Sequence, residues 1–119
     1  MIGKLGLIML VVKDMKRSIA FYRDVLGLKV QFEHPEWTQL SAGNMDLGLH
    51  PESEHLHVQV GGCQFAFFVE DVQETTQELK RRGVKFVMEP KKESFGWLAV
   101  FTDPDGYHIQ LGQAATYEK

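Results

Sequence analysis

The chain has 119 residues, of which 44% are hydrophobic and 24% are charged, and its formal net charge is −3. This composition is typical of a folded soluble domain of ordinary size and excludes a disordered chain. Lysine and arginine form no cluster that could follow a phosphate backbone, and the first apolar stretch, residues 5–12, is too short to cross a membrane. We therefore expect neither a nucleic-acid nor a membrane partner.

The first predicted elements are a strand and a helix. Leu7–Val12 is an apolar run of the kind found in buried strands, and it leads to Asp14, whose carboxylate is suited to cap a helix. Gly27 then follows the helix, where a glycine in the left-handed conformation commonly ends one. Between these two residues, apolar side chains recur at helical spacing at Met15, Ile19, Tyr22 and Leu26.

Three short strands follow this helix. We predict them at residues 28–32, 37–42 and 46–49, with turns at Pro35 and at Gly43-Asn44. A polar segment, residues 51–62, comes next and ends in two glycines, which is typical of a linker.

The second half of the chain repeats the first. Val12-Lys13-Asp14-Met15 returns as Val69-Glu70-Asp71-Val72, 57 positions later, after another apolar run at residues 65–69. Asp71 is the second predicted helix cap and Gly83 the second stop. Strands are predicted at residues 84–88, 96–102 and 107–111, with turns at Pro90 and at residues 103–106.

The order of elements is therefore βαβββ, twice, which predicts an α+β fold. We expect module one at about residues 5–50, a linker at 51–62 and module two at about 63–112, all within a single domain 1–119. The one cysteine, Cys63, cannot form an internal disulfide, as is expected in a reducing compartment, and the cytoplasm is the default location. No cationic residue is adjacent in the sequence to activate its thiol, so we expect Cys63 to be buried rather than reactive.

Two motifs carry a resemblance to a known family. Residues 14–28 (DMKRSIAFYRDVLGL) and 101–111 (FTDPDGYHIQL) resemble the vicinal oxygen chelate superfamily, whose members include glyoxalase I, extradiol dioxygenases, and fosfomycin- and bleomycin-resistance proteins. The resemblance covers about residues 5–112. It implies two modules that form a curved, partly closed mixed sheet with the helices outside, the site inside, and a homodimer.

In metal-dependent members, the first and last strands of each module supply the ligands, and the metal polarises substrate oxygens. Here the implied positions hold Leu7, which has no lone pair, Gln64, where relatives usually carry histidine, and Gln110, where they usually carry glutamate. His50 is the only competent ligand on the last strand of module one. We therefore expect no metal cofactor, and the alternative is a weak site for Zn, Ni, Mn or Fe at His50, Gln64 and Gln110.

Strand alternation predicts which side chains line the concave inner side of the curved sheet, where the resemblance places the site. Leu7, Met9, Ala66 and Phe68 would form an apolar floor, and Gln64 and Gln110 would orient a ligand by hydrogen bonds. Trp37, Phe95 and Trp97 are candidates for an aromatic rim, although ordinary sheet packing is an alternative for each. His50 and His108 are the candidates for acid–base chemistry. His55 and His57 lie in the linker, where a solvated connector is the simpler interpretation and a metal contact the alternative.

Three functions compete at this point. The first is a binding protein that holds a small aromatic or amphipathic organic molecule without a metal, and we prefer it. The second is a glyoxalase-type lyase or ring-cleaving dioxygenase that has an unusual ligand set or uses His50 and His108. The third is a non-catalytic structural or assembly subunit.

Overall fold

The structure is a computed structural model that describes residues 1–94 and 96–114. Phe95, one of the three predicted rim aromatics, lies outside the described residues. The chain divides into two compact units, with the boundary between Gln59 and Val60, inside the predicted linker. That both units form one domain stays a prediction.

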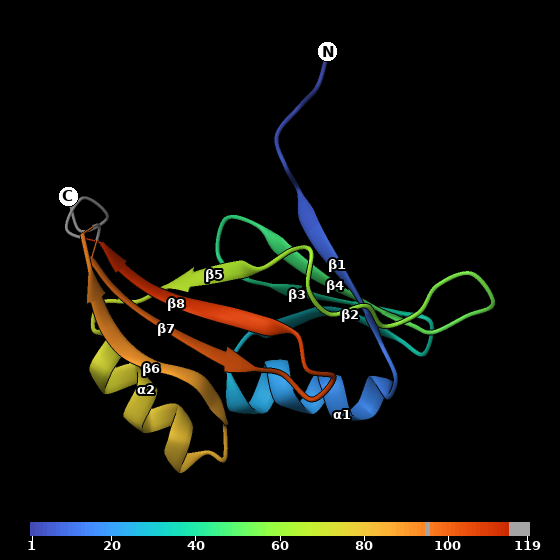
Figure 1. The fold of residues 1–119 in the computed structure, drawn as a ribbon. Helices are drawn as coiled ribbons and strands as arrows, with labels where there is room; N and C mark the ends of the chain where they lie inside the picture. The colour runs from blue at the N-terminus through green and yellow to red at the C-terminus, as the bar shows by residue number, and fades with distance from the viewer. Residues whose placement is uncertain (95, 115–119) are drawn as a thin grey trace. The chain divides into compact units, whose positions relative to one another are not determined.

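The first unit is a four-stranded mixed sheet with one helix (Figure 1). The strands lie in the order β1-β4-β3-β2, with β1 and β4 parallel and the other neighbours antiparallel. Its elements in chain order are β1 (Leu7–Val12), α1 (Met15–Ala20), the π-helical turn η1 (Phe21–Val25), β2 (Lys29–His34), β3 (Trp37–Ser41) and β4 (Asp46–Pro51).

Local sequence explains where the first helix begins and ends. The Asp14 carboxylate accepts a hydrogen bond from the backbone N–H of Arg17 at 3.1 Å, as the predicted cap requires. Gly27 has a φ of 84°, which a side chain would strain. The helical pattern continues beyond Ala20 as the wider turn η1, which keeps Tyr22 fully buried. The apolar residues of the buried face under this helix are Leu10, Val12, Leu40, Leu47 and Leu49.

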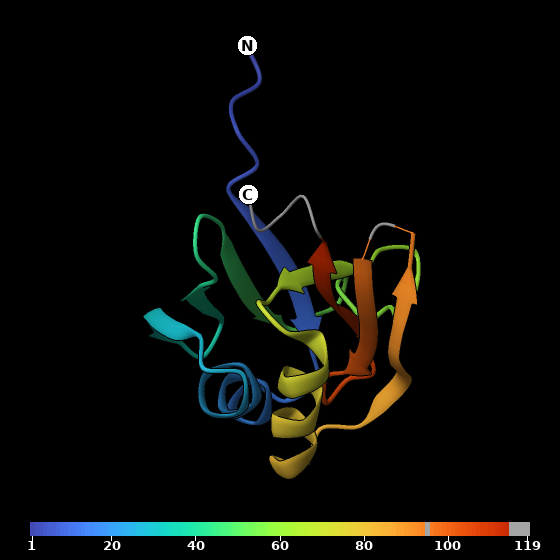
Figure 2. The same ribbon diagram turned by 90° about the vertical axis from the view of Figure 1, so that its left-hand side faces the viewer.

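The second unit repeats this order of elements. Its strands lie in the order β5-β8-β7-β6, and β5 and β8 are parallel. The α2 helix packs on β6, β7 and β8, and Figure 2 shows it from its side. The elements are β5 (Phe65–Phe68), α2 (Val72–Arg81), β6 (Phe86–Glu93), β7 (Gly96–Thr102) and β8 (His108–Ala114). The predicted α+β class is therefore confirmed, as two separate four-stranded sheets.

The cap and the tight turn of the second unit are also as predicted. The Asp71 carboxylate accepts the N–H of Glu74 at 3.0 Å, and Gly83 ends the helix with a φ of 89°. In the last turn, buried Asp103 accepts the N–H groups of Asp105 and Tyr107 through one carboxylate oxygen, each at 2.9 Å. The carboxylate thus accepts backbone N–H groups that would otherwise lack an acceptor within the turn. These hydrogen bonds fix the conformation of the chain where it enters β8.

Two sequence predictions are wrong. Pro90 does not make a turn, because β6 runs through it to Glu93 with a register shift between Met88 and Lys91. Proline lacks an N–H, and it is tolerated here because β6 is an edge strand that bulges at this point. Cys63 is exposed rather than buried.

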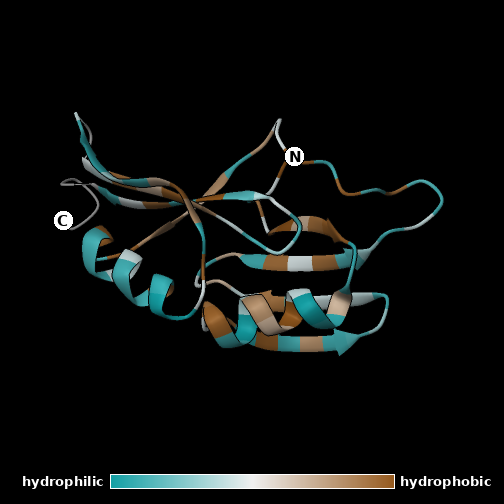
Figure 3. Cartoon of the chain, turned by 60° about the horizontal axis from the view of Figure 1, so that its bottom comes forward, coloured by the Kyte–Doolittle hydropathy of each residue, from teal (hydrophilic) through white to brown (hydrophobic). Residues whose placement is uncertain are grey.

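In Figure 3, α2 presents mostly hydrophilic residues. The strands β2 and β4 alternate hydrophobic residues with polar residues or glycine, whereas β1 and β5 are apolar along their whole length. Each helix therefore covers one face of its own sheet with its apolar stripe and turns its polar side to solvent. None of the helices in the described part of the chain has the length and apolar character that a membrane span needs.

Candidate functional site

Each sheet has one face under its helix and an opposite face, which we call the open face. In β1, Leu10 and Val12 are buried under α1, so the alternating residues Leu7 and Met9 lie on the open face. Leu7 is 36% exposed and Met9 is 40% exposed. The predicted apolar lining of module one is therefore on the side of the sheet away from the helix.

An indole ring lies over Gly48 on the open face of the first unit. Met9 pairs with Gly48 on β4, and Gly48 pairs with Gln39 on β3. A Cβ atom built on Gly48 would lie 2.3 Å from Cη2 of Trp37, so the ring occupies the space that a side chain at position 48 would need. The ring is held in place because Trp37 Nε1 donates to Gln39 Oε1 at 3.2 Å, and Gln39 Nε2 donates to the Asp46 carboxylate at 2.7 Å.

His50 lies beside this ring rather than among ligand groups. It pairs with Val11 near the end of β4 and is half-buried. Its Nδ1 is 2.7 Å from the carbonyl oxygen of Pro51, and its ring meets Trp37 edge-on, with centroids 6.5 Å apart. The contact with a backbone oxygen leaves Nε2 as the nitrogen with which His50 could act on a ligand.

The open face of the second unit combines two amides with an aromatic ring. Gln64, Ala66 and Phe68 are all exposed, and Ala66 pairs with Gln110 on β8. Gln110 Nε2 donates to Gln64 Oε1 at 2.8 Å. Phe68 is 58% exposed and lies against Gly112, where an added Cβ would be 3.1 Å from its ring. Four of the predicted binding residues are thus brought together on one surface.

Two further predicted residues have different positions. His108 is exposed on the same face as Gln110, two residues away along β8, which leaves it accessible to a ligand. Trp97 pairs with Gln113, whose side chain accepts the N–H of Val72 at the start of α2. Trp97 is therefore on the helix side of the sheet, and the structure does not bring it to the open face.

Strand register identifies the equivalent positions of the two modules. The repeat places Ala66 57 residues after Met9; Met9 pairs with Gly48, and Ala66 pairs with Gln110. Gly48 is therefore the equivalent of Gln110, and His50 is two residues beyond it. Sequence reasoning missed this because no motif in module one marks the register of its last strand.

The donor groups at the four equivalent positions do not fit a transition metal. Leu7 and Gly48 offer no donor atom, and Gln64 and Gln110 are neutral amides hydrogen-bonded to each other. Zinc, nickel, manganese and iron prefer imidazole, thiolate or carboxylate. Within residues 1–94 and 96–114, no three His, Cys, Asp or Glu side chains lie close enough together to hold a metal ion, so His55 and His57 take part in no such cluster.

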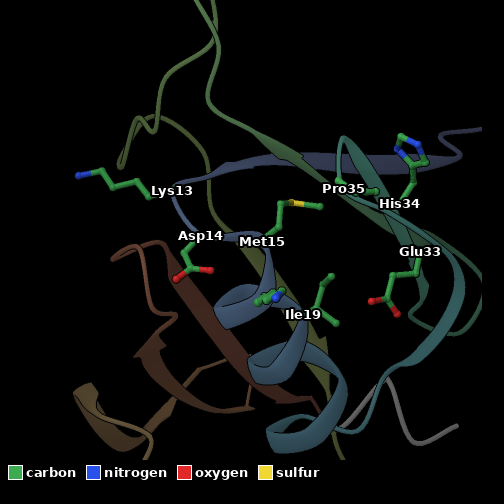
Figure 4. A pocket seen from close by; sticks show the side chains of 8 residues that line it. Lys13, Asp14, Met15, Ile19, Glu33, His34 and Pro35 are labelled. Carbon is green, nitrogen blue, oxygen red and sulfur yellow. The ribbon is translucent and has the colours of Figure 1, made fainter.

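A cavity and the charged groups with shifted pKa values lie elsewhere. A cavity of about 600 Å³ opens between the start of α1 and the end of β2, on the helix side of the first sheet, and it was not predicted from the sequence (Figure 4). The cavity is lined by Lys13, Asp14, Met15, Lys16, Ile19, Glu33, His34 and Pro35.

Hydrogen bonds from Arg81 and Arg82 lower the pKa of Glu78 on the surface of α2.

Comparison with known proteins connects this architecture to a family. The model of the Glyoxalase/Bleomycin resistance protein/Dioxygenase superfamily matches residues 4–111. A lactoylglutathione lyase of Salmonella typhimurium is 32% identical over 123 aligned positions, which cover 89% of each chain. A probable chloroplastic lactoylglutathione lyase of Arabidopsis thaliana is 30% identical, and this chain spans only 33% of its length. Among solved structures, TnmS3, an antibiotic binding protein from Streptomyces sp. CB03234, has a TM-score of 0.82 at 26% identity, covering 96% of this chain and 98% of its own.

Proposed function

We propose that this chain, which belongs to the Glyoxalase/Bleomycin resistance protein/Dioxygenase superfamily, binds a small organic molecule on the open faces of its sheets without a metal. One observation carries the proposal. Where the family resemblance places metal ligands, the open faces hold hydrocarbon and a hydrogen-bonded amide pair.

The apolar side chains of these faces support binding of an organic molecule. Leu7 and Met9 in the first unit and Phe68 in the second are exposed although they are large and hydrophobic. Covering such side chains with an organic ligand removes apolar surface from water, which stabilises a complex by about 25 cal/mol per Å² buried. Trp37 and Phe68 also offer flat rings on which an aromatic ligand could stack.

The comparisons support the same class of function. TnmS3, an antibiotic binding protein, is similar in fold to this chain over nearly its full length. We extend to this chain only the chemistry that its own faces support, which is binding of an aromatic or amphipathic molecule. A homodimer and a cytoplasmic location are parts of the same proposal. Sedimentation of the purified protein and fractionation of cells test them.

The two tryptophans provide a test with a built-in control. Trp37 lies on an open face and Trp97 on a helix side. The variants W97F and W37F each keep a single indole, whose fluorescence emission can be followed. We expect fused-ring aromatic compounds to change the emission of W97F, whose remaining indole is Trp37, and to leave W37F unchanged. For the second unit, F68A should weaken binding, whereas V87A, an exposed apolar position at the opposite edge of the sheet, should not. If no compound in the panel binds, the structural-subunit function replaces this proposal.

An enzyme is the second candidate, because a relative of 32% identity is a lactoylglutathione lyase and two histidines lie on the open faces. Lactoylglutathione lyase activity, measured with zinc or nickel added, tests it. Activity that is lost in both H50A and H108A would support the enzyme, and absence of activity at every metal concentration would support the binding protein.

A further inference from the structure

The amide pair of the second unit keeps hydrogen-bonding groups available for a ligand. Its one bond uses a hydrogen of Gln110 Nε2 and a lone pair of Gln64 Oε1. The Nε2 amide of Gln64, a donor, and the Oε1 carbonyl of Gln110, an acceptor, take no part in that bond. The pair therefore presents the Gln64 amide as a donor group and the Gln110 carbonyl as an acceptor group together on an exposed surface.

The surroundings of the pair carry no formal charge. The side chains that share the open face on β5, β8 and β7 follow from alternation and register, and none of those described is a carboxylate, lysine or arginine. They are Ala66, Phe68, Leu98, Val100, Thr102, His108 and Gly112. An ionic ligand would lose its hydration here without gaining a counter-charge, so the face favours a neutral molecule.

The spacing of the residues limits the size of the ligand. Gln110 and Gly112 are two residues apart on β8, which is about 6.6 Å along a strand. The small side chain of Ala66 lies beside Gln110, and the Phe68 ring lies over Gly112. A planar molecule of about two fused rings spans the distance from the amides to the aromatic ring, because the small side chain of Ala66 leaves space for it.

We propose that this face recognises neutral, planar cyclic amides, in which an N–H donor is next to a carbonyl acceptor. The ligand N–H donates to Gln110 Oε1, the ligand carbonyl accepts from Gln64 Nε2, and the fused ring packs on Phe68. This inference rests on the proposed function, and it adds the chemical class of the ligand.

A pair of probes of equal shape tests it. Isoquinolin-1-one is a bicyclic lactam, and isocoumarin is the lactone in which oxygen replaces the N–H group. Binding is followed by NMR titration of the side-chain NH₂ signals of Gln64 and Gln110. We expect the lactam to bind roughly tenfold more tightly than the lactone, because the lactone leaves the acceptor of Gln110 unpaired.

Substitutions separate the two glutamines. Q110L should remove the preference for the lactam, since the ligand N–H, which alone distinguishes the lactam from the lactone, donates to this residue. Q64L should weaken both probes alike, since both carry the carbonyl. Q77M, at an exposed position of α2, is the control and should bind both probes as the unmodified protein does.

The outcomes distinguish a failure of this inference from a failure of the proposed function on which it rests. Equal affinity of the two probes, with F68A still weakening both, would overturn amide recognition and leave organic binding intact. No binding of either probe up to its solubility would overturn both for this face.

Discussion

Gly48 is the residue on which the Trp37 indole lies, so G48A perturbs the open face of the first unit directly. The new Cβ would be 2.3 Å from Cη2 and 2.6 Å from Cζ2 of the ring. Because carbon atoms in contact are about 3.5 Å apart, the ring must move by about 1.2 Å. Such a movement strains or breaks the 3.2 Å hydrogen bond from Nε1 to Gln39.

These effects give an expected loss of stability. Overpacking costs about 1–3 kcal/mol, and the hydrogen bond contributes about 1 kcal/mol. Replacing glycine in a strand with alanine returns about 0.5–1 kcal/mol. Trp37 is half-buried and the ring can turn outward, so we expect the free energy of unfolding to fall by about 1–2 kcal/mol.

Urea denaturation and tryptophan emission measure the two consequences. In a W97F background, all emission comes from Trp37, and G48A should shift it to longer wavelength as the ring becomes more exposed to water. G112A is the matched control, because its new Cβ would meet Phe68 rather than Trp37. An unchanged emission together with an unchanged denaturation midpoint would refute the placement of the indole on Gly48.

Two further predictions concern the second unit. D71A should lower the free energy of unfolding by about 1 kcal/mol in urea denaturation, because the backbone N–H of Glu74 loses its cap, and D71N should largely preserve it. Arg81 and Arg82 lower the pKa of Glu78, so its contribution to stability is present above the ordinary carboxyl pKa and is lost as the pH falls through the lowered one. E78Q should therefore reduce the loss of stability on acidification, measured as denaturation midpoints over pH, and an unchanged acid dependence would contradict this.

Local signals in the sequence were sufficient for most of the fold. The strand Leu7–Val12 has the predicted bounds, and Asp14 and Asp71 cap their helices as predicted. These features depend on residues close together in the chain, whose preferences are strong: a carboxylate before a helix, and a glycine after it. The family resemblance, drawn from two motifs of this kind, is confirmed by the match over residues 4–111.

The errors arose where contacts between distant residues decide the outcome. Pro90 looked like a turn because its tolerance depends on β6 being an edge strand with a bulge, which only the pairing reveals. For Trp97 the sequence left a rim position and ordinary sheet packing open, and only its register with Gln113 shows that it lies on the helix side. The contact of Trp37 with Gly48 joins two strands, and neither residue alone indicates it.

The candidate site could be predicted in part. Alternation along β1 and β5 correctly grouped Leu7 with Met9, and Gln64 with Ala66 and Phe68, because residues two apart share a face. The hydrogen bond between Gln64 and Gln110 could not be foreseen, since it depends on how two side chains orient across neighbouring strands.

Elemental analysis of the protein, purified without a chelator and then dialysed against zinc, tests the central claim most directly. If Leu7, Gly48, Gln64 and Gln110 hold the positions at which relatives bind metal, the protein should retain far less than one equivalent of zinc, nickel, manganese or iron. Retention of one equivalent, lost in a variant in which Gln64 and Gln110 are both replaced by leucine, would contradict the account.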